Sequence, residues 1–111
     1  MVVYCNNIIL ADKVCIADNF IERFLGLMGK KSLGHGEGLL LLNSPSIHCF
    51  FMRMSIDVIY LSKNFKVLGI ETLRPWSIGK YIKKTRHILE LKEGTAFNIK
   101  AGDTILFRIE K

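Results

Sequence analysis

The chain has 111 residues, half of them apolar, and 16 Lys and Arg against 10 Asp and Glu give it a net charge of +6. This composition excludes a disordered or fibrous chain, because such chains lack the apolar residues that a core needs. Aliphatic runs such as Leu39–Leu42 stop after four residues, whereas a membrane-spanning helix needs about 20. We therefore predict a single globular domain over residues 1–111.

The cysteines and the N-terminus suggest a compartment. Cys5, Cys15 and Cys49 are an odd number without a paired spacing, which argues against the disulfide framework of a secreted protein. The start of the chain, Met1–Asn7, has no basic flank of the kind that opens a signal peptide. We expect a cytoplasmic protein.

The first predicted elements are short strands. Val2–Cys5 and Ile8–Leu10 flank Asn6 and Asn7, a pair that tolerates positive φ and suits a tight hairpin. A further strand is expected at Val14–Ala17.

One helix is predicted after these strands. Asp18 and Asn19 are typical helix N-cap residues. The apolar residues that follow recur at helical spacing, namely Phe20, Phe24, Leu27 and Met28. This pattern predicts a helix over about 19–28.

Strand patterns dominate the rest of the chain. The segment 47–62 has 16 residues and would exceed about 50 Å if straight, so we expect a bend near residues 54–56. Other strands are expected at 39–42, 66–73, 85–91 and 104–109, with a helical turn near 95–98. These elements predict an α+β fold, a mainly antiparallel curled sheet or small barrel with one main helix.

Several segments, in this order, resemble the domain-of-unknown-function 192 family. They are Gly26–Leu33, Gly36–Leu41, Ile47–Arg53 with Ile56–Leu61, Ile88–Leu91 with Gly94–Ala96, and Ile99–Asp103. The resemblance covers about residues 20–107 and implies a strand-rich α+β domain. It implies no activity, cofactor or catalytic residue. Ser55 stands where the family often has a proline in the bend.

Polar residues interrupt the apolar segment between His48 and Asp57. Burying an unpaired polar group costs about 1–3 kcal/mol, so these residues either pair within the fold or line a pocket. The leading hypothesis is a non-catalytic binding domain with a small anionic ligand or partner segment in a cleft near the 47–57 strand. Arg53 and Arg23 would pair with the anion, His48 and Asp57 would orient it, and Trp76 would cover it.

No metal or other cofactor is predicted. Residues 48 and 52 of a straight strand lie about 13 Å apart, too far to share one ion. The Gly34–Gly38 segment lacks the Gly-Lys-Ser/Thr of a phosphate-binding loop.

A basic stretch supports an alternative function. There is no acid between Glu71 and Glu90, and aromatic residues are interspersed among the cations. The cations are Arg74, Lys80, Lys83, Lys84 and Arg86, beside Trp76, Tyr81 and His87. Such a stretch is either a solvated loop or a nucleic-acid-binding module, because cations attract phosphates and aromatic rings stack on bases. An acidic protein partner is a further reading of the same charge.

The third hypothesis is a small hydrolase or transferase centred on His48 and Asp57. Ser46, Ser55 or Cys49 would then serve as the nucleophile. Adjacent strand residues face opposite ways, so His48 is badly placed to activate Cys49, and no Gly-x-Ser-x-Gly motif is present. We lean against an enzyme.

Overall fold

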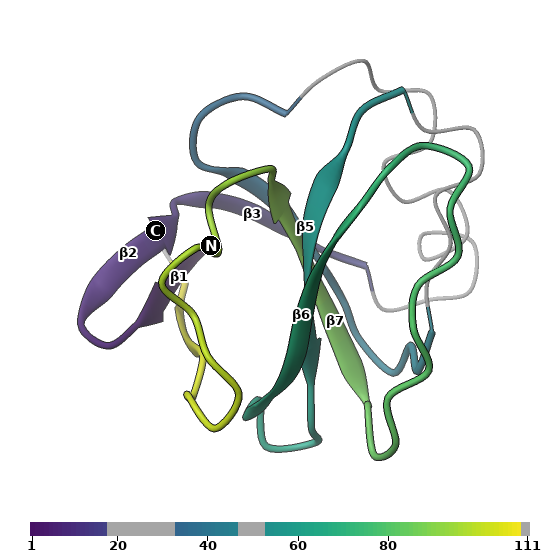
Figure 1. The fold of residues 1–111 in the computed structure, drawn as a ribbon. Coiled ribbons are helices and arrows are strands. Elements are labelled where there is room, and N and C mark those ends of the chain that lie inside the picture. The colour runs from purple at the N-terminus through teal and green to yellow at the C-terminus, as the bar shows by residue number, and fades with distance from the viewer. Residues whose placement is uncertain (18–32, 47–52, 110–111) are drawn as a thin grey trace.

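A computed structural model describes residues 1–17, 33–46 and 53–109 (Figure 1). These residues form eight strands in two sheets. The strands are β1 (Val2–Cys5), β2 (Ile8–Ala11), β3 (Lys13–Ala17), β4 (Glu37–Leu41), β5 (Ile56–Leu61), β6 (Val67–Leu73), β7 (His87–Lys92) and β8 (Leu106–Arg108).

The smaller sheet has three antiparallel strands in the order β2-β1-β8. The hairpin between β1 and β2 turns at Asn6 and Asn7, whose φ angles are 53° and 64°. Positive φ at both positions is the mirror-image turn whose twist matches a two-residue hairpin. The predicted hairpin is therefore confirmed.

The larger sheet has five strands in the order β3-β4-β7-β5-β6. β3 and β4 run parallel, and every other neighbouring pair is antiparallel. β5 lies between β6 and β7, so that Asp57 is opposite Thr72 on one side and Leu91 on the other. The sheet is open, with β3 and β6 at its edges.

The predicted α+β class and small barrel are wrong. The described residues contain strands in two sheets and no helix, which makes this part of the chain all-β. The helix expected over about 19–28 lies outside the described residues. A small barrel would require one long curled sheet. Instead, β8 pairs with β1, about a hundred residues earlier in the chain, and these two strands form a separate three-stranded sheet with β2.

The five-stranded sheet buries side chains on both faces. Alternate strand residues point to opposite faces, so the strand core divides into two clusters. The first cluster joins the large sheet to the small one and contains Val3, Cys5, Leu40, Ile59, Leu89 and Leu91, among others. The second cluster covers the opposite face and contains Leu33, Leu39, Val58, Tyr60, Leu73 and Ile88, with Ile82 packed against it.

Figure 1 shows the same arrangement in space. The β1–β2 hairpin lies on one side of the large sheet, and the connection from β6 to β7 lies on the other. No helix within the described ranges is long and apolar enough to cross a membrane.

Candidate functional site

Asp57 lies at the start of β5 and is only 4% exposed. Its Oδ1 atom accepts a hydrogen bond from the Thr72 hydroxyl at 2.8 Å. Its Oδ2 atom accepts hydrogen bonds from the backbone N–H groups of Gly94 at 2.9 Å and Ala96 at 3.0 Å. One carboxylate thus ties β5 to β6 and to the turn after β7.

The hollow beside Asp57 has an acidic lining. It has a volume of about 340 Å³, and its lining includes Asp57, Glu71 and Glu93 but no Lys, Arg or His. The Glu71 carboxylate lies on the opposite face of the sheet. Asp57 and Glu93 place negative charge beside the hollow and no cation of its lining offsets it, so an anion is repelled at close range. This hollow is unsuited to an anionic ligand.

The other residues of the predicted ligand site are dispersed or outside the described part. His48 and Arg23 lie outside the described residues. Arg53 is exposed just before β5, and Trp76 is 61% exposed in the connection between β6 and β7. Asp57 bonds to Thr72 and to the 94–96 backbone rather than to Arg53 or Trp76. The ligand site and the catalytic hypothesis at His48 and Asp57 stay predictions.

The connection between β6 and β7 carries the strongest concentration of positive charge. We call residues 74–86 the basic segment: it holds five cations and no acid. Arg74, Lys80, Lys83, Lys84 and Arg86 are all exposed. No ion pair joins any of these five side chains to another described residue. Their positive charge is therefore available to a partner.

Backbone hydrogen bonds shape both ends of the basic segment. Ser77 N–H donates to the Arg74 carbonyl at 3.2 Å, and Thr85 N–H donates to the Ile82 carbonyl at 3.2 Å. The second of these turns places Lys83 and Lys84 at its two central positions, and Lys84 has a φ of 73°. Two lysines thus occupy the tip of a closed turn.

The middle of the basic segment is attached to the large sheet. The Glu71 carboxylate on β6 accepts a hydrogen bond from the Lys80 backbone N–H at 2.7 Å and another from the Tyr60 hydroxyl. Ile82 packs against the second core cluster. A Cβ atom at Gly69 would lie 2.6 Å from Ile82 Cδ1, so the glycine leaves the space that Ile82 fills.

His87, next to the basic segment, belongs to the core. Its Nδ1 atom accepts a hydrogen bond from the Asn43 backbone N–H at 3.1 Å, and its ring stacks on Phe65 with 4.5 Å between centroids. Burial lowers the pKa of His87, and the nearby Arg86 cation lowers it further. A buried neutral imidazole adds no charge to the basic segment.

Glu90 is a buried carboxyl that sequence reasoning missed. It is 3% exposed and lies on β7 between Leu39 of β4 and Val58 of β5. Its Oε2 atom has no hydrogen-bond partner in the part of the chain that the structure describes. Burial raises the pKa of Glu90 to about 8. The only available signal was a lone acid within the apolar segment Ile88–Leu91.

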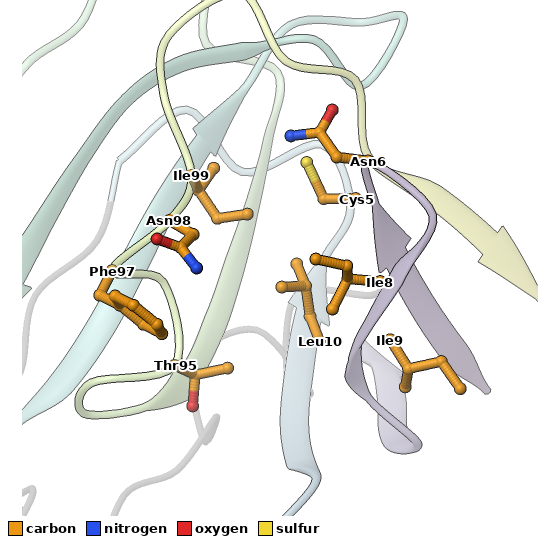
Figure 2. Close-up of a pocket in the computed structure, with 9 residues that line it drawn as sticks. All are labelled: Cys5, Asn6, Ile8, Ile9, Leu10, Thr95, Phe97, Asn98 and Ile99. Carbon is orange, nitrogen blue, oxygen red and sulfur yellow. The ribbon is translucent and has the colours of Figure 1, made fainter.

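A small apolar pocket lies between the β1–β2 hairpin and the 95–99 turn (Figure 2). It has a volume of about 170 Å³ and is lined by β2, by Cys5 and Asn6, and by residues of the 95–99 turn. Figure 2 shows Ile8 and Leu10 across the pocket from Asn98 and Ile99. None of the lining residues is charged. Burial and the nearby Asp103 carboxylate raise the pKa of the Cys5 thiol, which therefore stays protonated and unreactive near pH 7.

A metal centre is not formed by the described side chains. Among residues 1–17, 33–46 and 53–109, no group of three or more His, Cys, Asp or Glu could hold an ion.

The family model described as "Uncharacterized ACR", DUF192, matches residues 4–107 of this chain. The chain belongs to the DUF192 family. The resemblance seen in the sequence is thereby confirmed, and the family carries no established function.

Relatives of this DUF192 chain are similar over most of their length. A UPF0127 protein of Pyrococcus horikoshii is 47% identical over 100 residues, which cover 84% of this chain and 85% of the relative. A UPF0127 protein of Pyrococcus furiosus is 37% identical over 98 residues, with 84% of each chain covered.

Two solved structures share the DUF192 fold seen here. A protein of unknown function from Novosphingobium aromaticivorans has a TM-score of 0.78 at 21% identity, covering 96% of this chain and 84% of its own. A putative transcription regulator from Sinorhizobium meliloti has a TM-score of 0.73 at 20% identity, covering 84% of this chain and 79% of its own. At these identities the likeness concerns the fold alone.

Proposed function

We propose that this DUF192 domain is a non-catalytic binding module that contacts nucleic acid through the basic segment, residues 74–86. The observation that carries the proposal is the set of five exposed cations without an acid or an ion-pair partner among the described residues. A nucleic-acid backbone is the ligand that we expect for such a surface. Each cation that contacts a phosphate releases condensed counterions, and this release favours binding.

Charge placement favours the basic segment over the neighbourhood of Asp57 as the contact surface. The hollow at Asp57 has no Lys, Arg or His in its lining, whereas the basic segment carries +5 over 13 residues. The second proposal is a small anionic ligand in a cleft near the 47–57 strand. Arg53 and Arg23 would pair with it, His48 and Asp57 would orient it, and Trp76 would cover it. Arg23 and His48 lie outside the described residues. The described geometry supports the basic segment more strongly.

The experiment is a titration of a fluorescently labelled 20-nucleotide strand at several salt concentrations, read by anisotropy. Five phosphate contacts on a single strand predict that log K falls with log salt with a slope of about −3.5. Replacing both turn lysines, Lys83→Gln with Lys84→Gln, should reduce the steepness of that slope by about 1.4, because each phosphate contact on a single strand contributes about 0.7.

A matched control separates local contacts from net charge. Lys13 and Lys100 are exposed and lie outside the basic segment, so Lys13→Gln with Lys100→Gln removes the same two charges elsewhere. The control should retain the wild-type slope. Absence of binding at about 50 mM salt, or equal weakening in both double variants, would refute the proposal.

A further inference from the structure

The basic segment exposes aromatic and aliphatic side chains as well as cations. Tyr81 is 81% exposed, Ile78 is 71% exposed and Trp76 is 61% exposed. Three of the nine exposed large apolar side chains in the described residues thus fall within six consecutive positions. Phosphate binding alone gives these side chains no role, because their surface carries no charge.

Tyr81 is held in place by both of its neighbours. Before it, the Lys80 backbone N–H is bonded to Glu71 on β6 at 2.7 Å. After it, the Ile82 side chain packs into the second core cluster, in the space left by Gly69. The backbone at Tyr81 is therefore fixed to the sheet while its ring remains in solvent. Because this backbone is already ordered, stacking on the Tyr81 ring costs less conformational entropy than stacking on a ring of a mobile loop.

The lysines at the tip of the adjacent turn lie two and three residues beyond Tyr81. The turn closed by the Thr85 N–H exposes both Lys83 and Lys84. Cations next to an exposed ring are the combination with which proteins hold single strands, since the cations follow the backbone and the ring stacks on a base. A duplex offers phosphates but keeps its base faces covered by stacking.

We infer that Tyr81 is a stacking platform for an unpaired base, so that the basic segment selects single-stranded over double-stranded nucleic acid. This inference rests on the proposed function and names its substrate class. Tyr81 supplies the preference for single strands, and Lys83 with Lys84 supplies the salt-dependent part of the affinity.

The experiment compares a labelled 20-nucleotide single strand with a duplex of the same length at one salt concentration. The wild-type protein should bind the single strand more tightly. Tyr81→Ala should weaken single-strand binding about 5- to 150-fold, the range given by loss of one stacked base. Duplex binding and the salt slope should not change. Tyr81→Phe keeps the ring and should retain single-strand affinity.

Two further readouts separate stacking from folding. Trp76 is the single tryptophan of the chain, so its fluorescence should change when a single strand binds to the segment. The urea midpoint of Tyr81→Ala should equal that of the wild type, because an exposed ring contributes little to stability.

The outcomes distinguish this inference from the proposed function. Equal affinity for both nucleic acids, unaltered by Tyr81→Ala but weakened by the double lysine variant, overturns the single-strand inference and leaves the proposed function standing. No binding of either nucleic acid overturns both. Selective loss of single-strand affinity in Tyr81→Ala, with rescue in Tyr81→Phe, supports both.

Discussion

The five-stranded sheet buries a carboxyl group on each of its faces and holds the two in different ways. Asp57 lies on the face toward the small sheet and accepts three hydrogen bonds. Glu90 lies on the adjacent strand but points to the opposite face, between Leu39 and Val58. Its Oε2 atom has no partner among the described residues, and burial raises its pKa to about 8.

The difference shows what decides the role of a buried acid. A carboxylate surrounded by hydrogen-bond donors joins the elements that supply those donors. At Asp57 the donors come from β6 and from the turn after β7. A carboxyl group among aliphatic side chains avoids the cost of a buried charge by keeping its proton. Asp57 therefore fixes the fold, whereas Glu90 makes the fold sensitive to pH.

The largest expected effect is the loss of the Asp57 carboxylate. Asp57→Ala leaves the Thr72 hydroxyl and the Gly94 and Ala96 N–H groups without their acceptor. The Ala96 N–H is buried, whereas the Thr72 hydroxyl and the Gly94 N–H are partly buried and can bond to water instead. Because a buried donor left unsatisfied costs about 1–3 kcal/mol and the other two donors less, we expect the free energy of unfolding to fall by about 3 kcal/mol or more. Urea denaturation measures this change. Asp12→Ala, at an exposed acid, is the control and should cost less than about 0.5 kcal/mol. Equal stability of the two variants would show that the Asp57 bonds contribute little.

Glu90 should produce the next largest effect, as a dependence on pH. A glutamate titrates near 4.5 in the unfolded chain and Glu90 near 8 in the folded one. Between these values the folded state holds a proton that the unfolded state has released. The free energy of unfolding should therefore fall as pH rises, by at most about 1.4 kcal/mol per unit. The stabilisation that the bound proton of Glu90 provides is fully present below pH 4.5 and is lost above pH 8.

Substitution by an amide isolates this dependence. Glu90→Gln does not titrate, so the variant should gain about 1–3 kcal/mol relative to the wild type between pH 5 and pH 8. Urea midpoints at several pH values provide the measurement. Glu93→Gln removes an exposed acid nearby and should keep the wild-type profile. If Glu90→Gln also follows the wild-type profile, Glu90 does not hold a proton in the folded state.

Local features could be predicted from the sequence, and long-range ones could not. The hairpin at Asn6 and Asn7 follows from the turn preference of two residues. The sequence left two interpretations of Asp57 open, a partner within the fold or a place in a pocket. Its backbone donors belong to residues 94 and 96, which lie far from it in the chain. The division into two sheets depends on β8 pairing with β1, a contact that no local pattern encodes.

The same distinction applies to the functional residues. The basic segment could be read from the lack of acids between Glu71 and Glu90. Its attachment through Glu71 and Ile82 depends on which side chains meet across the sheet. Glu90 escaped notice because a strand with one covered face would leave a lone acid in solvent, and only the tertiary structure shows both faces covered.

The smallest expected effect concerns Gly69, on the same side as Glu90, where Ile82 attaches the basic segment. Gly69→Ala would place a Cβ atom 2.6 Å from Ile82 Cδ1. The contacting atom is the end of a flexible side chain, so we expect a loss of only about 1 kcal/mol. Ile82→Val removes that atom, and in its presence Gly69→Ala should be neutral or slightly stabilising, since alanine restricts the unfolded chain more than glycine does. A double-mutant cycle on urea midpoints measures the coupling. Additive effects would mean that Ile82 does not occupy the space above Gly69, and the basic segment would then be attached by its hydrogen bonds to Glu71 and to the Leu61 carbonyl.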